Sequence, residues 1–192
     1  IYCGRMGAWS RLTATPESPP IPTRFRACSL LLLAPGAAFA EGDPLCESLG
    51  ELFGADQTYG QYAYLSDDQI ETLKGAMGLT SCTQFPRVSL SCSAEDGTTN
   101  DYSVAKGWTG ALQEKADALT ARMEACPGFE GWRPQEAENS GSATYPLMTK
   151  RWLNHGRDLQ ITLTHGFVRH AKTKRSAFYN RVYTIRFDAI EP

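Results

Sequence analysis

The chain has 192 residues and a formal net charge of −2 at pH 7, with hydrophobic residues making up 42% and charged residues 21%. From Glu41 onward it is long enough for one domain with a buried core. That part contains no internal repeat and no apolar run that could cross a membrane, which excludes a repeat array and a transmembrane segment there.

The beginning of the chain has the three-part pattern of a secretory signal. Arg24 and Arg26 precede an apolar run over 27–34, and Ala38-Phe39-Ala40 supplies the small side chains that a signal peptidase accepts. A buried core helix is the alternative, but the chain turns polar directly after Ala40. We interpret the chain as an upstream or disordered leader over 1–23, a signal peptide over 24–40 and a single exported domain over 41–192.

Four cysteines follow the predicted cleavage site, and an even number in an exported chain predicts two disulfides. Three connectivities are possible. We favour Cys82–Cys92, which closes a short loop, and Cys46–Cys126, which ties two helices together. The alternative is four free, buried thiols. None of these cysteines has Cys-x-x-Cys spacing, so the sequence does not indicate a redox motif or a zinc ribbon.

Helical patterns fill much of the first part of the domain. Asp43-Pro44 predicts a helix start, with Asp as the N-cap and Pro at the first helical position. Ser66 to Gln69 form a capping box that opens a short helix, which Gly78 ends. The strongest pattern predicts an amphipathic helix over 106–125, ended by Pro127-Gly128.

Strand patterns follow in the last part. Alternating apolar residues predict strands over 145–153, 159–167 and 179–189, joined by a turn at 154–157, with Gly156 placed for positive φ, and by a basic turn at 170–175. Sequential strands with short turns form an antiparallel meander with one buried face. An earlier strand over 88–92, with a partner over 100–104, predicts an additional hairpin.

The long helix and the meander each present an apolar face that needs a partner, and packing one on the other satisfies both. The predicted fold is therefore α+β. N-terminal helices, one of them long and amphipathic, pack on a C-terminal three-stranded antiparallel β-meander, with a short additional strand or hairpin near 88–104.

Motifs of catalysis are missing from the sequence. There is no G-x-S-x-G elbow, no P-loop, no G-x-G-x-x-G after a strand and no H-E-x-x-H. The sequence therefore predicts no catalytic, cofactor-binding or metal-binding residue. His165 shares the parity of the apolar residues of its strand, so it is either a structural core residue or the base of an unrecognised hydrolase site.

Charge is unevenly distributed along the domain. Residues 41–149 hold 6 Lys and Arg against 17 Asp and Glu, whereas residues 150–192 hold 9 against 3. Arginine and aromatic side chains, which are enriched in binding hot spots, gather near the last turn. The candidate partner-binding residues are Trp152, Arg169, Lys172, Lys174, Arg175 and Tyr179. The alternatives are charges that protect a sheet edge from aggregation, or two halves that neutralise each other.

These patterns favour a small periplasmic or secreted protein without readable catalytic chemistry, a protein-binding module such as an inhibitor or an immunity-type factor. The expected partner is a protein with an acidic surface, because basic charge speeds encounter with such a surface. Nucleic acid is not expected, given the compartment and the acidic first part. The other hypotheses are a periplasmic hydrolase with a site near His165, and a structural or assembly factor of the cell envelope.

Overall fold

The computed structural model describes residues 42–54, 62–85, 89–94, 97–171 and 176–190. The predicted leader and signal peptide, together with Lys172, Lys174 and Arg175, lie outside the described residues. The predicted α+β fold is confirmed, with three helices packed on an antiparallel sheet. Among the helices of the described ranges, none combines the length and the apolar character needed to cross a membrane.

The first two helices begin at the predicted caps. In α1 (Pro44–Leu52) the side chain of Asp43 accepts a hydrogen bond from the backbone N–H of Leu45, and proline occupies the first turn. In α2 (Asp67–Met77) the capping box of Ser66 and Gln69 is present. Gly78 ends α2 in the left-handed conformation, with φ of 64°, which a glycine adopts without steric cost.

The third helix, α3 (Tyr102–Glu124), is 23 residues long and starts earlier than predicted. The carboxylate of Asp101 accepts a hydrogen bond from the backbone N–H of Ser103 and so caps the helix. The predicted strand over 100–104 is therefore wrong, because its last three residues form the first turn of α3. The hairpin of this region lies upstream, between Ser81 and Ser93.

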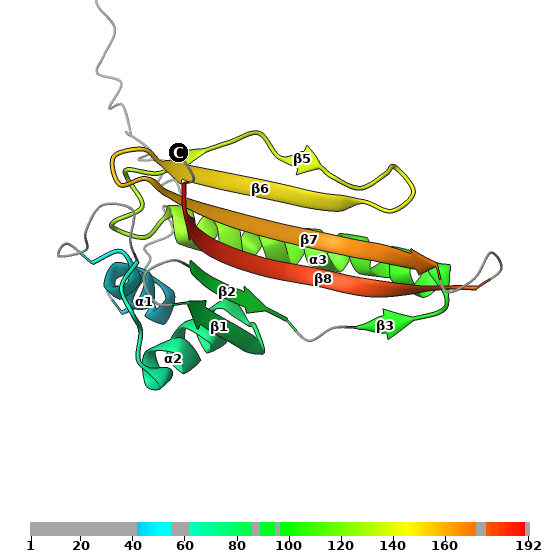
Figure 1. The fold of residues 1–192 in the computed structure, drawn as a ribbon, viewed down its shortest axis with the longest axis horizontal. Coiled ribbons are helices and arrows are strands. Elements are labelled where there is room, and N and C mark those ends of the chain that lie inside the picture. The colour runs from blue at the N-terminus through cyan, green and yellow to red at the C-terminus, as the bar shows by residue number, and fades with distance from the viewer. Residues whose placement is uncertain (1–41, 55–61, 86–88, 95–96, 172–175, 191–192) are drawn as a thin grey trace, which may run out of the picture. The chain divides into compact units, whose positions relative to one another are not determined.

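The sheet is antiparallel in every described pairing and has the order β1-β2-β8-β7-β6-β4, with β3 paired to β8 and β5 to β6. The strands are β1 (Ser81–Phe85), β2 (Ser89–Ser93), β3 (Thr98–Thr99), β4 (Arg133–Pro134), β5 (Glu138–Asn139), β6 (Leu147–Asn154), β7 (Leu159–Ala171) and β8 (Ala177–Ala189). The three long strands β6, β7 and β8 form the predicted meander, and they run side by side in Figure 1.

The turn between β6 and β7 forms where predicted, because the N–H of Arg157 donates to the carbonyl of Asn154. The positive φ of this turn belongs to Asp158, at 52°, and Gly156 is not among the residues with positive φ. The expected role of Gly156 is therefore wrong. Aspartate adopts this left-handed conformation more readily than most residues, since its short polar side chain bonds locally.

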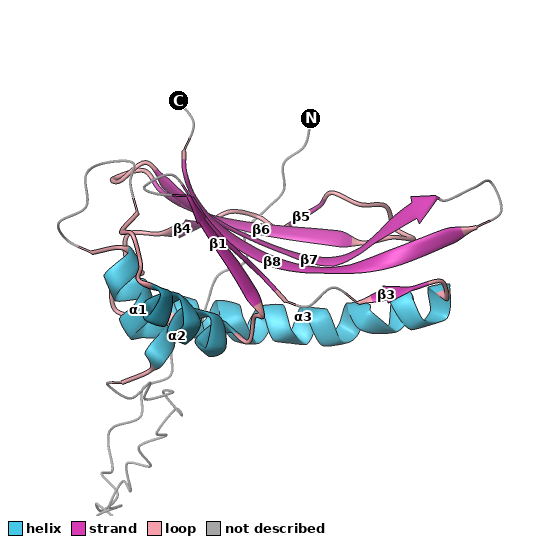
Figure 2. Ribbon diagram, turned by 60° about the horizontal axis from the view of Figure 1, so that its bottom comes forward, coloured by secondary structure: helices cyan, strands magenta, loops and turns pink. Residues whose placement is uncertain are grey.

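All three helices lie on one face of the sheet, and α3 runs along β7 and β8 (Figure 2). Alternate residues of β7 such as Leu159, Ile161 and Leu163 are buried beneath α3, whereas Gln160 and Thr162 between them are half-buried on the other face. The main core lies between these two layers. A second, smaller core cluster, centred on Ala105, Phe167 and Tyr179, lies where α3 begins.

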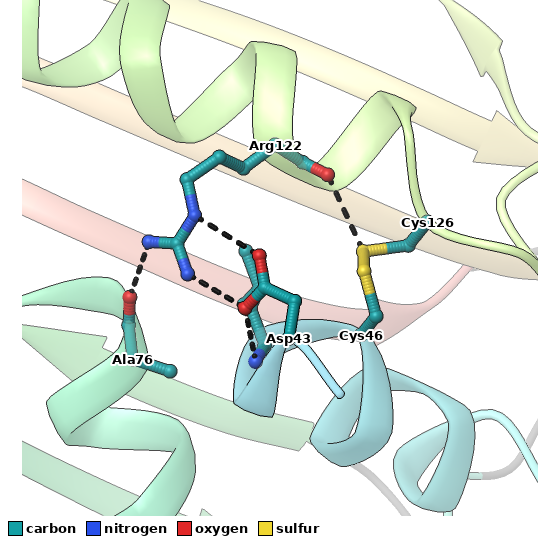
Figure 3. The surroundings of a disulfide bond; sticks show 6 residues. Asp43, Cys46, Ala76, Arg122 and Cys126 are labelled. Carbon is teal, nitrogen blue, oxygen red and sulfur yellow. Dashed lines mark hydrogen bonds and ion pairs between the residues drawn. A yellow bond between two sulfur atoms is a disulfide. The ribbon is translucent and has the colours of Figure 1, made fainter. Parts of the chain in front are cut away.

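Both favoured disulfides are present. Cys82–Cys92 joins directly paired positions of β1 and β2, and Cys46–Cys126 joins α1 to the residues that follow α3. Figure 3 shows the second disulfide beside an ion pair between Asp43 and Arg122. Cys46–Cys126 and this ion pair tie α1 to the end of α3 across 80 and 79 residues of sequence.

Candidate functional site

Trp152 does not belong to the surface predicted for partner binding. Its side chain is 0% exposed within the core, and its indole N–H donates to the carboxylate of Glu124 at 2.8 Å. Along the sheet Trp152 pairs with Ile161, eight residues from Arg169 on the same strand, which is about 26 Å at the usual rise of a strand. The structure therefore places Trp152 at a different site, as a packing residue.

Arg169 and Tyr179, two of the candidate partner-binding residues, lie together because they are directly paired on β7 and β8. Arg169 is exposed, and its guanidinium carbon lies 5.9 Å from the centre of the Tyr145 ring. Tyr179 is 8% exposed and packs underneath. Its ring centre lies 6.1 Å from that of Tyr145 and 6.0 Å from that of Phe167. An exposed cation therefore lies over a half-buried ring, which packs in turn on the buried rings of Phe167 and Tyr179.

We call the four rings of Tyr102, Tyr145, Phe167 and Tyr179 the tip aromatic cluster. Tyr102 is the first residue of α3, and its ring centre lies 5.8 Å from that of Tyr179 and 5.9 Å from that of Tyr145. It is 37% exposed, and its hydroxyl donates to the carbonyl of Thr144. Edge-to-face and tilted contacts of this kind add to the stabilisation from burial. Tyr102 and Tyr145 were not among the predicted residues, because they come from elements distant in sequence.

Arg169 makes no ion pair with any residue of the described ranges. An arginine stacked on an aromatic ring keeps the edge of its guanidinium available, and that edge matches a carboxylate bidentately. On the other face of the same strand pair, the exposed ring of His170 stacks on Phe178, with centres 4.9 Å apart and planes 14° apart. Near its end the β7–β8 hairpin thus carries Arg169 against Tyr145 on one face and His170 against Phe178 on the other.

A second feature is a pocket of about 220 Å³ between α3 and strands β6 and β7. His165 lines it and is 6% exposed. Burial lowers the pKa of His165 below its ordinary value, and the nearby carboxylate of Asp117 acts in the opposite direction. Within the described ranges the imidazole takes part in no hydrogen bond. The predicted core orientation of His165 is confirmed, but the ring faces a cavity and not only packed carbon.

The remaining walls of the pocket combine polar and apolar groups. On α3, the side-chain amide of Gln113 donates to the carboxylate of Asp117 at 2.9 Å. On β6, Nζ of Lys150 lies 3.1 Å from a carboxylate oxygen of Glu124, so this lysine already has an ion-pair partner. Among the described residues no hydroxyl, thiol or carboxylate is hydrogen bonded to His165.

A third feature is a depression of about 660 Å³ on the face of the sheet opposite the helices. Arg151 and Arg186 flank it, on either side of Thr162 in the strand register. Each arginine is matched by a carboxylate, since Arg151 lies 3.4 Å from Glu138 and Arg186 lies 2.9 Å from Asp188. The depression is therefore polar but carries little unbalanced charge.

No cluster of three or more His, Cys, Asp or Glu side chains that could hold a metal ion occurs in the ranges described. Comparison with protein-family models, with curated proteins and with solved structures gives no significant match. The fold and the site therefore define the chain as an α+β protein with two disulfides, an aromatic and basic hairpin end and a small pocket at His165. Its function has to be argued from these sites.

Proposed function

We propose that this chain is an exported binding protein that contacts an acidic surface of another protein with the end of its β7–β8 hairpin. The observation that carries the proposal is the exposed guanidinium of Arg169, held over Tyr145 on the tip aromatic cluster. Arginine and aromatic side chains lying together are the composition enriched in binding hot spots.

The sequence between the two strands strengthens the charge of this end. Lys172, Lys174 and Arg175 follow β7 directly, and Arg169 and His170 are its last polar residues. A cluster of cations raises the rate of encounter with an acidic surface and makes binding sensitive to salt. The first part of the domain is strongly acidic, which disfavours a nucleic acid as the partner.

Export is supported by two features that are independent of the hairpin. The segment 24–40 has the pattern of a signal peptide, and both disulfides need an oxidising compartment to persist. A small, cross-linked domain that presents one rigid basic end suits a stoichiometric inhibitor or an immunity-type factor. Such a protein acts by covering an acidic region of its partner.

The test is capture of the partner from an envelope extract of the source cells by the immobilised full chain. We expect Arg169→Glu to reduce capture about tenfold, and the triple reversal of Lys172, Lys174 and Arg175 to Glu to abolish it, because like charges repel at the contact. Capture by the native chain should also fall when the salt concentration is raised from about 50 mM to about 500 mM.

The matched control is Arg133→Glu, which reverses an exposed arginine on β4, away from the hairpin end. It should leave capture unchanged. Equal capture by the native chain and by the triple reversal would remove the hairpin end from consideration.

A further inference from the structure

We propose that the pocket at His165 binds a small organic cation, a primary amine that also carries a hydrogen-bonding group. This site is separate from the hairpin end, since His165 and Arg169 lie four residues apart on β7, about 13 Å along the strand. The inference does not depend on the proposed partner, and it assigns a ligand class to a cavity that partner binding does not use.

The first argument is the unpaired imidazole. A neutral histidine offers one hydrogen-bond donor and one acceptor. Buried polar groups nearly always have partners, because leaving one unpaired costs free energy. His165 is 6% exposed and bonds to no side chain or backbone group of the described ranges, and its ring nitrogens are not among the fully buried unpaired atoms, so they open on the pocket that His165 lines. Its hydrogen-bonding capacity is therefore directed to whatever occupies the pocket.

The second argument is the charge at the rim. Asp117 is exposed on α3 and accepts a hydrogen bond from Gln113, but it forms no ion pair within the described part of the chain. Lys150, the basic residue of the lining, is matched by Glu124 at 3.1 Å. With Lys150 matched by Glu124 from outside the lining, Asp117 is the charge of the lining without a counter-charge among the described residues, which favours a cationic ligand.

The third argument is size and shape. A volume of about 220 Å³ exceeds what a single water needs and is below the range of drug-sized ligands. Ala116, Met148 and Leu163 supply apolar walls in the same pocket as His165 and Asp117. A ligand with a short carbon chain fits between them, with its ammonium at Asp117 and its polar group at His165.

Ethanolamine is a suitable probe, because it joins an ammonium to a hydroxyl through two carbons. The full chain, labelled with carbon-13 and nitrogen-15, is titrated with ethanolamine while the ring signals of its three histidines are followed by NMR. His165→Gln identifies the His165 signal, and the exposed His155 and His170 serve as internal references. We expect a saturable shift confined to His165, and none with 1,2-ethanediol, which lacks the charge.

The decisive variant is Asp117→Asn, which removes the charge from an exposed position and keeps the shape. It should weaken ethanolamine binding about tenfold or more, whereas Glu114→Gln, on an exposed position of α3 outside the pocket lining, should leave it unchanged. Thermal unfolding of each variant verifies that the fold is retained. The inference is overturned if ethanolamine leaves the His165 signal unmoved, or if Asp117→Asn binds as tightly as the native chain.

Discussion

Asp43 and Arg122 join the beginning of α1 to the last turns of α3 across 79 residues of sequence, with Nη2 of Arg122 2.8 Å from a carboxylate oxygen of Asp43. The same guanidinium donates from Nη1 to the carbonyl of Ala76 near the end of α2, at 2.7 Å. One arginine therefore ties all three helices together, next to the Cys46–Cys126 disulfide (Figure 3).

Replacing Asp43 by Asn should isolate the ion pair, because Asn caps a helix about as well as Asp. We expect Asp43→Asn to lower the free energy of unfolding by about 1 kcal/mol at pH 7, and Asp43→Ala to lower it further through loss of the cap. The hydrogen bond from Arg122 lowers the pKa of Asp43 below 3.8. The ion pair therefore stabilises the fold fully above pH 3.8, and this stabilisation is lost as the pH falls through the lowered pKa of Asp43 in the folded state.

Urea unfolding at a series of pH values checks this expectation. The native chain and Asp43→Asn should differ most at neutral pH and converge under strongly acidic conditions. A difference that grows as the solution is acidified would contradict the assignment.

The two disulfides should contribute unequally, because they close loops of different length. Cys46–Cys126 spans 80 residues and Cys82–Cys92 spans 10. In the chain-entropy model their removal costs about 4.5 and about 2.7 kcal/mol respectively. Paired Cys→Ser variants, compared by urea unfolding without reductant, measure both losses. A larger loss for the short loop would show that restriction of the unfolded chain is not the main effect.

Acidification should destabilise the fold through His165. The pKa of His165 lies below 6.5 because burial disfavours the charged imidazolium, and the nearby carboxylate of Asp117 opposes this effect only in part. The other titratable neighbours of His165 are Lys150, which is paired with Glu124, and Tyr183, which is its cross-strand partner. The unfolded chain thus takes up a proton before the folded chain does. Stability is complete above pH 6.5 and falls, by at most about 1.4 kcal/mol per pH unit, down to the folded-state pKa.

His165→Gln should flatten this dependence, and His155→Gln, at an exposed turn position, should preserve it. Denaturant unfolding between about pH 8 and about pH 5 measures the slope. An unchanged slope in His165→Gln would mean that another group is responsible.

Gly166 should tolerate no side chain. Its φ of 140° lies outside the region that other residues adopt, and a Cβ there would collide with the carbonyl oxygen of Pro146. We expect Gly166→Ala to destabilise the protein by about 3 kcal/mol. Gly107→Ala is the matched control, since a Cβ at Gly107 in α3 meets nothing within 4 Å. It should stabilise the fold by about 0.5–1 kcal/mol, so the two variants should shift the melting temperature in opposite directions.

Features that depend on neighbours in sequence were predictable. The caps at Asp43 and Ser66, the stop at Gly78 and the alternation of β7 and β8 all follow from bonds and side-chain directions within a few residues. The α+β arrangement followed from two apolar faces that each needed cover. The disulfide pairing followed from cysteine spacing and from the predicted helices.

Features that depend on distant residues were decided only in three dimensions. The sequence places Trp152 among surface residues. In the structure the register of β6 turns its side chain into the core, where its indole N–H donates to Glu124 on α3. Tyr145 and Tyr102 join Arg169 because two long strands and a long helix end at the same place. Local patterns did not decide whether Asp101 precedes a strand or caps a helix, nor whether His165 packs against apolar side chains or lines a cavity. Both depend on packing between segments that are far apart in sequence.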